Sequence, residues 1–290
     1  MITPRRFATA ANCRNQTKLW CNEARMIEIG WMFLLLGSFV GFMAGLFGIG
    51  GGGIMVPVLT SIFLRQGVPV ENVVHLALGT SMASMIVTSI SSLRAHNSKG
   101  GVIWKVVRGM ATGVIAGAFL STFIASYLSS VYLAIFFAVF MAYVSIQMFF
   151  NKKPKPSREL AGNTGLFIAG SGIGAISALV SIGGGSLTVP YLTWQNVEVK
   201  KAIGTSAAIG LPISIAGTLG YLVNGWASSS PQDFSFGFVY LPAALLISAA
   251  SFFTAPYGAK LAYKLHVSVM KKAFSILLII LSIKMLVSVM

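Results

Sequence analysis

Repeated apolar segments of membrane-spanning length constrain the fold of this 290-residue chain more than any other feature of its sequence. A helix needs about 20 apolar residues to cross about 30 Å of hydrocarbon, because each residue adds about 1.5 Å of length. The chain carries about eight hydrophobic segments that approach or reach this length. Its residues are 56% hydrophobic and 9% charged, a balance that is not that of a soluble domain. We therefore predict an all-α polytopic membrane protein.

The charged residues are strongly unbalanced, with 21 Lys and Arg against 6 Asp and Glu. The basic residues lie between the apolar segments, which is typical of cytoplasmic loops that follow the positive-inside rule and does not indicate nucleic-acid binding. Neither Asp nor Glu lies deep in an apolar segment, so a cation path has little support. The 13 Met and the cysteines Cys13 and Cys21 lack the spacing of metal ligands. We expect neither a metal nor a cofactor.

The chain contains an internal repeat. Residues 41–60 align with residues 174–193 without a gap, at a constant offset of 133 residues. A Gly-Thr-Ser element recurs later in each half, and a polar run separates the halves. We divide the chain into a polar tail at 1–25 that is disordered or not native, a first membrane repeat at 26–150, a cytoplasmic linker at 151–163 and a second membrane repeat at 164–290.

Each half is predicted to hold one helix, a glycine-rich break, a short apolar piece and three longer helices. The short pieces span about half of the hydrocarbon thickness as helices, so we expect each to form a re-entrant hairpin with the helix before it. The expected ranges are 30–47, 54–64, 76–93, 104–126 and 131–150 in the first half, and 165–182, 187–195, 202–223, 237–256 and 268–289 in the second.

Loop charge predicts that the two halves have opposite orientations. The segments 94–108, 151–163 and 258–272 each carry four Lys or Arg and should be cytoplasmic, whereas 127–131 and 224–237 carry none and should face outward. Equivalent loops of the two repeats therefore lie on opposite sides, which gives inverted repeats with both termini outside. The alternative is four crossings per half in parallel orientation, which would place the basic segment 258–272 outside.

The glycine-rich breaks are the candidate substrate site. Gly48–Gly53 formally matches a dinucleotide motif, but a helix and not a strand precedes it. Unwound backbone at membrane depth is tolerated where it is buried in protein or lines a cavity, and the half-helices that follow start with unpaired N–H groups at the positive end of their dipoles. Inverted repeats would bring two such ends together near the midplane, where they would favour an anion. The expected backbone donors are Gly50, Gly51, Gly52, Gly53, Gly183, Gly184, Gly185 and Ser186, with Pro57 and Pro190 fixing the half-helices.

The repeated Gly-Thr-Ser element supplies the other candidate site residues. The hydroxyls of Thr80, Ser81, Thr205 and Ser206 are equally compatible with substrate contact and with hydrogen bonds that hold helices together. Their recurrence beside both breaks favours a contact with substrate, with Gly79 and Gly204 as structural members of the site. Ser186 stands where the first half has Gly53, so the site would be asymmetric.

Other recurring residues have simpler interpretations. Glycines at four-residue spacing, as in Gly37, Gly41 and Gly45, favour close helix packing. His75 and His266 lie near predicted helix ends and are expected to be solvated. Arg94, followed by His96 and Asn97, is expected to anchor a loop at the membrane interface.

The segment Gly45–Pro57 and the two Gly-Thr-Ser elements resemble the sulfite exporter TauE/SafE family of membrane permeases. The second copy of the segment, which ends with Ser181–Pro190, shows the same resemblance. The resemblance covers the chain from Met26 to the C-terminus. It implies secondary transport of small sulfur-containing anions, such as sulfite or sulfonates, in a bacterial cytoplasmic (inner) membrane. The motif positions that carry over are Gly50–Gly52, Pro57, Gly79–Ser81, Gly183–Gly185, Pro190 and Gly204–Ser206.

We therefore expect a secondary transporter that works by alternating access, with a small anion and the lipid bilayer as partners and a proton or the membrane potential as the coupling agent. The sequence holds no nucleotide-binding loop, which argues against direct use of ATP. A passive anion channel on the same scaffold is the alternative. An enzyme is not expected, because the apolar segments lack a Cys, His, Asp or Glu cluster for nucleophilic or acid–base chemistry.

Overall fold

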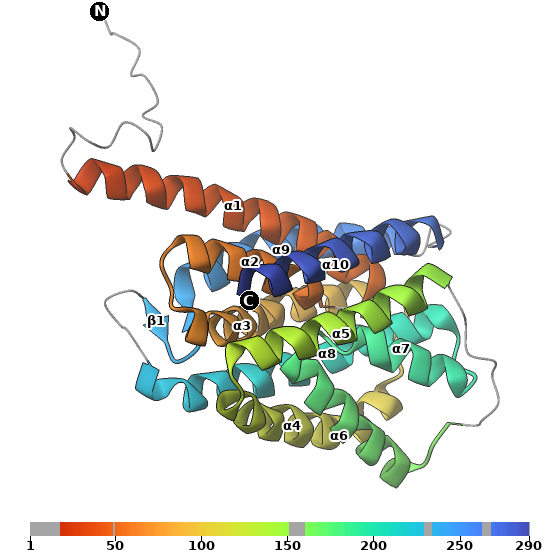
Figure 1. The fold of residues 1–290 in the computed structure, drawn as a ribbon. Coiled ribbons are helices and arrows are strands. Elements are labelled where there is room, and N and C mark those ends of the chain that lie inside the picture. Colours follow the sequence, from red (N-terminus) through yellow and green to blue (C-terminus); the bar gives the residue numbers. More distant parts are fainter. Residues whose placement is uncertain (1–17, 49, 151–159, 229–233, 263–267, 290) are drawn as a thin grey trace, which may run out of the picture.

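The protein folds as a bundle of α-helices (Figure 1). The structure, a computed structural model, describes residues 18–48, 50–150, 160–228, 234–262 and 268–289. The first half contains α1 (Lys18–Phe47), α2 (Gly52–Arg65), α3 (Val70–Asn97), α4 (Trp104–Tyr127) and α5 (Ser130–Phe150). The second half contains α6 (Asn163–Leu179), α7 (Gly185–Trp194), α8 (Val199–Asn224), α9 (Leu241–Ala262) and α10 (Ser268–Val289). Between α8 and α9 lie the 3-10 helix η2 (Trp226–Ser228) and the antiparallel strands β1 (Ser235–Phe236) and β2 (Val239–Tyr240).

The prediction of an all-α polytopic membrane protein is confirmed. Helices α3, α4, α5, α8 and α9 and the part of α1 from Gly30 onward are long and apolar enough to cross a membrane. Helix α1 begins at Lys18, so residues 18–25 are helical where we expected a polar tail; residues 1–17 lie outside the described residues. The re-entrant path of α1 with α2 stays a prediction.

Helix pairs are exchanged between the two halves. Helix α1 of the first half packs along α9 of the second half. Its counterpart α6 of the second half packs along α4 of the first half. The glycines of α1 make this approach possible, because a Cβ atom on Gly37 would lie 2.5 Å from the carbonyl oxygen of Ile247, and one on Gly41 2.5 Å from the Cα of Ser251. On α6, a Cβ on Gly170 would lie 2.7 Å from a carbonyl oxygen of α4. The predicted role of these glycines in close packing is confirmed.

Helices α3 and α8 form the centre of the bundle and run antiparallel. They are the most buried of the candidate spans, with 72% and 67% of an apolar 18-residue stretch of each helix buried. Successive positions of α8 meet α3 in reverse order, since a Cβ on Gly210 would lie 3.1 Å from Ser89 Oγ and one on Gly217 3.3 Å from Met82 Cγ. The same inference holds for α5 and α10, because Lys272 at the start of α10 lies over the ring of Phe149 at the end of α5.

Antiparallel contact between repeat-equivalent helices is what opposite orientation of the halves requires. The antiparallel packing of α3 with α8 and of α5 with α10 agrees with inverted repeats, which stay a prediction. The orientation of each loop relative to a membrane stays a prediction.

The expectation of a solvated His75 is wrong. Helix α3 begins at Val70, so His75 lies in its second turn and is only 4% exposed. Its Nε2 atom lies 3.0 Å from the carbonyl oxygen of Ala125 and its Nδ1 atom 3.3 Å from Ser130 Oγ. The histidine therefore ties the start of α3 to the connection between α4 and α5. His266 lies outside the described residues.

Candidate functional site

The two glycine-rich breaks lie in direct backbone contact. A Cβ atom on Gly50 would lie 2.7 Å from the Cα of Gly183, and one on Gly183 would lie 2.8 Å from the Cα of Gly50. Met85 of α3 packs against the same point, with its sulfur 3.1 Å from the Cβ position of Gly183. The structure therefore brings together the two segments that the repeat predicted to converge, and any side chain on either glycine would separate them.

The two breaks share an unusual backbone conformation. Gly51, with φ 82°, and Gly184, with φ 78°, cap α2 and α7 at equivalent positions in the left-handed region. Gly48, with φ 68°, and Ser181, with φ 49°, form a second equivalent pair in this region. Of these four residues, Ser181 is the one that is not glycine, so its backbone adopts a conformation that residues with a Cβ atom rarely adopt. Its hydroxyl donates a hydrogen bond of 3.3 Å to the carbonyl of Leu78 on α3.

Each half-helix begins with backbone N–H groups that have no acceptor in the described part of the chain. The first bonds of α2 and α7 run from the N–H of Ile54 to the carbonyl of Gly51 (3.1 Å) and from the N–H of Leu187 to the carbonyl of Gly184 (3.0 Å). Such unpaired donors lie at the positive end of a helix dipole and favour an anion. The buried residues whose N–H groups donate to no described residue are Gly50–Gly53 and Gly183–Ser186.

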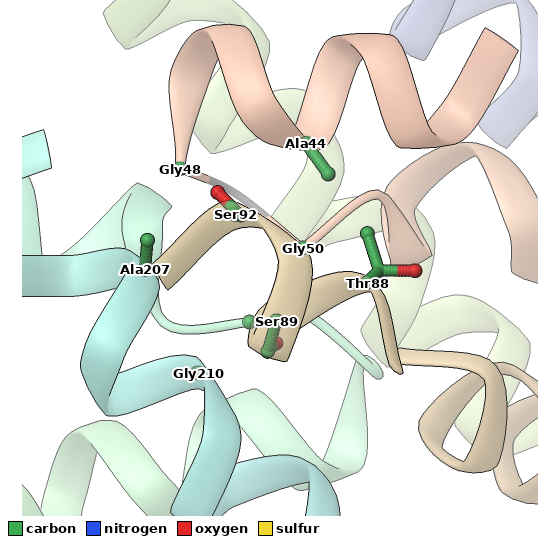
Figure 2. A pocket seen from close by; sticks show the side chains of 9 residues that line it. Ala44, Gly48, Gly50, Thr88, Ser89, Ser92, Ala207 and Gly210 are labelled. Atoms are coloured by element: carbon green, nitrogen blue, oxygen red, sulfur yellow. The ribbon is translucent and has the colours of Figure 1, made fainter. Parts of the chain in front are cut away.

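A small cavity of about 10 Å³, room for about one water molecule, lies beside the contact of the two breaks (Figure 2). One wall is the end of α1 with the first break, another is α3, and a third is α8 with the second break. None of the described residues that line it carries a charge. The lining residues are Ala44, Gly48, Gly50, Thr88, Ser89, Ser92, Gly183, Ala207 and Gly210.

The hydroxyl groups of the pocket all come from α3. Ser92 is 3% exposed, and its Oγ atom has no hydrogen-bond partner among the described residues. Ser89, 4% exposed, lies one turn earlier (Figure 2). Thr88 is already engaged, since its Oγ1 atom lies 2.7 Å from Ser251 Oγ and 3.1 Å from the carbonyl oxygen of Ser84. Ser92 is therefore the donor that is most clearly available to a ligand.

The threonines of the two Gly-Thr-Ser elements lie outside the pocket lining and connect the halves. Thr80 Oγ1 accepts a 2.9 Å hydrogen bond from the N–H of Tyr240, just before α9. Thr205 Oγ1 accepts a 3.0 Å bond from the N–H of Ile103, just before α4. These equivalent bonds favour the structural interpretation of both hydroxyls, and a contact between them and substrate stays a prediction.

The remaining predicted hydroxyls have different environments. Ser206 Oγ donates a 2.8 Å hydrogen bond to the carbonyl of Ile203 in its own helix and lies 3.4 Å from the carbonyl oxygen of Gly48 in the first break. The Oγ atoms of Ser81 and Ser186 are buried without a hydrogen-bond partner among the described residues, and neither side chain lines the pocket.

The predicted structural members of the site lie where chains approach closely or a helix loses a hydrogen bond. Gly79 packs against the backbone of Phe238, and a Cβ on Gly204 would lie 2.7 Å from the carbonyl carbon of Gly101. Pro57 and Pro190 are each the sixth residue of their half-helix and lie in its second turn. Having no N–H, each leaves a carbonyl one turn earlier without its helical donor.

Of the nine lining residues, Gly50 and Gly183 were predicted, and Thr88, Ser89 and Ser92 are the hydroxyl-bearing residues among the others. The signal that could have found them is the run of hydroxyl residues along α3, where Ser81, Ser84, Thr88 and Ser92 recur at helical spacing. The Gly-Thr-Ser element gave the stronger signal because it is repeated. The second half has Ile213 and Gly217 in the positions of Thr88 and Ser92, so a search for repeats could not detect these two; Ser89 aligns with Ser214.

His96 is part of the helix and not of a loop. It is 1% exposed, and its Nε2 atom lies 3.0 Å from the carbonyl oxygen of Gly45. Since a carbonyl can only accept, Nε2 carries the hydrogen of this bond. His96 lies one turn beyond Ser92 on α3 but does not line the pocket, whereas Arg94 is exposed as expected for an interface anchor.

Residues 33–285 match the family model described as sulfite exporter TauE/SafE. The chain belongs to this family. The resemblance inferred from the glycine–proline signature is thus confirmed. Among the residues that the structure describes, no group of three or more His, Cys, Asp or Glu could hold a metal ion.

Two relatives of this chain are named as probable membrane transporters. A "probable membrane transporter protein" of Haemophilus influenzae is 37% identical over 253 residues, which cover 87% of this chain and 96% of that protein. A probable membrane transporter protein of Methanocaldococcus jannaschii is 27% identical, over 81% of this chain and 86% of its own. No solved structure matches the chain significantly. The family and these names indicate a multi-pass membrane transporter rather than an enzyme.

Proposed function

We propose that this TauE/SafE protein is a secondary transporter of small sulfur-containing anions, such as sulfite or sulfonates, in the cytoplasmic membrane of a bacterium. The family description supports the substrate class, and the geometry of the site supports an anion. A proton or the membrane potential would supply the driving force.

The observation that carries this proposal is the meeting of two half-helix N-termini beside a pocket. Unpaired N–H groups from both breaks and the hydroxyl of Ser92 form a set of hydrogen-bond donors without a nearby carboxylate to repel an anion. An oxyanion presents several acceptor oxygens to such a set. Discontinuous helices that meet between two repeats are a common way for secondary transporters to bind substrates near the midplane.

The same contact is compatible with an alternating-access mechanism. The two breaks touch through Gly50 and Gly183 with no side chain between them, so one repeat can tilt against the other about this point. The hydrogen bonds of Thr80 and Thr205 cross between the repeats, so they would have to shift or break during this motion. In this scheme the halves have opposite orientations in the membrane, with the segments 94–108, 151–163 and 258–272 in the cytoplasm.

Uptake of labelled sulfite into proteoliposomes that contain the purified protein tests the proposal. We expect saturable uptake that responds to an imposed pH gradient or membrane potential and is inhibited by unlabelled sulfonates. The absence of uptake of any sulfur anion by correctly inserted protein would contradict it. Non-saturating uptake at channel rates, with single-channel currents in planar bilayers, would favour the passive anion channel instead.

A further inference from the structure

We propose that Met82 and Met85 of α3 form the gate that closes the path from the two breaks to the outer side, and that Ser177 of α6 lies on this path. The proposal rests on the proposed function, because it assumes alternating access, and it names the residues that the anion passes. It is carried by a comparison of repeat-equivalent positions on the two sides of the contact between the breaks.

The cavity lies on the cytoplasmic side of this contact. Its lining comes from late positions of α3, such as Ser92, and from early positions of α8, such as Ala207 (Figure 2). The exposed basic residues Arg94, Lys200 and Lys201 lie farther along these two helices toward the same end of the bundle. Positive charge predicts that this end is cytoplasmic.

The repeat identifies the corresponding positions on the outer side. Alignment of the two Gly-Thr-Ser elements pairs Ala207 of α8 with Met82 of α3, and Gly210 of α8 with Met85 of α3. Ala207 and Gly210 both line the cavity. The first half therefore carries two long side chains at positions where the second half carries a methyl group and a hydrogen atom.

The two methionines occupy the outer counterpart of the cavity. Both side chains are 0% exposed. The sulfur of Met85 lies 3.1 Å from the Cβ position of Gly183 and its Cε atom 3.3 Å from that of Gly52, so this thioether covers both breaks. The sulfur of Met82 lies 3.1 Å from the Cβ position of Gly217 on α8. The outer side is thus closed by side chains and not by contact between helix backbones.

Methionine is well suited to a gate of this kind. Its side chain is unbranched with three rotatable bonds, so it can repack without a change in the backbone. Its apolar surface excludes water and ions from the breaks while the gate is closed. When inverted repeats exchange their conformations, the outer side opens as the cytoplasmic side closes, and Met82 and Met85 then leave the path.

Ser177 supplies an independent observation on the same side. The gap-free alignment of the repeats pairs it with Ala44 of α1, which lines the cavity. Ser177 is 1% exposed, and its Oγ atom has no hydrogen-bond partner among the described residues. Ala44 shows that the equivalent position packs without a hydroxyl, and a buried hydroxyl without a partner is costly. The hydroxyl of Ser177 contacts the anion when the gate is open.

The accessibility of a single cysteine tests the gate without any need for transport. With Cys13 and Cys21 replaced by serine, Ser177→Cys in right-side-out membrane vesicles is treated with a membrane-impermeant maleimide. We expect slow labelling from the outer side. Met82→Ala or Met85→Ala should accelerate it at least about tenfold, because lost packing destabilises the closed gate. Met85→Leu, which keeps the volume of the side chain, should label as slowly as the parent.

Two matched controls separate a gate from general loosening of the bundle. Ser145→Cys on α5 replaces another fully buried serine without a described partner and should stay unlabelled in every background. Met285→Ala on α10 removes a methionine that is also 0% exposed and should not accelerate labelling of Ser177→Cys. Labelling that is unchanged by both gate substitutions, or equally accelerated by Met285→Ala, would overturn the proposal.

Sulfite uptake by the labelled protein tests whether Ser177 lies on the path. After excess reagent is removed, uptake by labelled Ser177→Cys should be lost, whereas the unlabelled variant should transport. Full uptake by the labelled protein would remove Ser177 from the path. If the gate substitutions accelerate labelling but the unmodified protein transports no sulfur anion, the gate stands and the proposed function fails. If sulfite enters but the gate substitutions leave labelling unchanged, the proposed function stands and the gate fails.

Discussion

At the scale of single residues, buried hydroxyl groups have two distinct roles in this protein. Thr80 and Thr205 use their oxygens to accept backbone N–H groups from the other half of the chain, whereas the hydroxyl of Ser92 faces a pocket without a partner. The first arrangement stabilises the bundle. The second leaves a donor that a ligand can use.

Thr80→Val tests the structural role. The variant keeps the shape of the side chain but removes the hydrogen bond between the N–H of Tyr240 and Thr80 Oγ1, so we expect a loss of about 1–2 kcal/mol in stability. Thermal unfolding of the detergent-solubilised protein measures this as a lower midpoint. Thr112→Val, at an exposed position of α4, is the control and should change the midpoint little. A midpoint that stays the same in Thr80→Val together with a higher KM for sulfite would instead assign Thr80 to the substrate site.

Gly50→Ala tests the contact between the breaks. The added methyl group would lie 2.7 Å from the Cα of Gly183, and the residue would have to adopt a φ of 77°. We expect transport to fall by at least about tenfold or the protein to fail to fold. Gly172→Ala is the control because a Cβ there meets nothing within 4 Å. Full transport activity in Gly50→Ala would contradict the close contact.

The sequence predicted the glycine breaks well and the hydroxyls of the pocket poorly. Three or four consecutive glycines have few uses inside a membrane helix, so their position in a repeat was informative. Serine in a membrane helix can bond to its own backbone, to another helix or to a ligand, and the sequence does not separate these roles. Only the fold shows that Ser92 lines the cavity between the breaks without a partner, while Ser206 bonds to the carbonyl of Ile203 in its own helix and reaches the carbonyl of Gly48.

At the scale of helices, the segment types were predictable because apolar length and glycine breaks determine them. Helix ends were less predictable, as α1 and α3 show. Both extend beyond their apolar segments through polar residues, so that His75 and His96 become helical and buried. The pairing of helices could not be predicted, because the glycine faces of α1 and α4 show that a helix approaches but not which one.

Cross-linking tests the antiparallel packing of α3 and α8. With Cys13 and Cys21 replaced by serine, Met82→Cys with Gly217→Cys should form a disulfide, because a Cβ on Gly217 lies 3.3 Å from Met82 Cγ. The control pair, Ser89→Cys with Gly217→Cys, should not cross-link, since Ser89 lies beside Gly210. Gel mobility under non-reducing conditions distinguishes them. Efficient cross-linking of the control pair alone would contradict the register.

At the scale of the whole molecule, exchanged and antiparallel helix pairs support two repeats inserted in opposite orientations. Reporter fusions after Asp233 and after Lys264 test this arrangement. We expect the first fusion to report the outer side and the second the cytoplasm, because positive charge is retained inside. A cytoplasmic reporter after Asp233 would contradict the inverted arrangement and favour the parallel alternative.

The central claim is that an anion binds where the two glycine breaks meet, beside Ser92. The most direct test is a structure of the protein with bound selenite, an analogue of sulfite whose selenium is located by anomalous scattering. The account predicts one selenium position in the pocket between Gly50, Gly183 and Ser92. A selenite oxygen should lie within hydrogen-bond distance of Ser92 Oγ. Selenium bound only elsewhere, with this pocket closed, would contradict it.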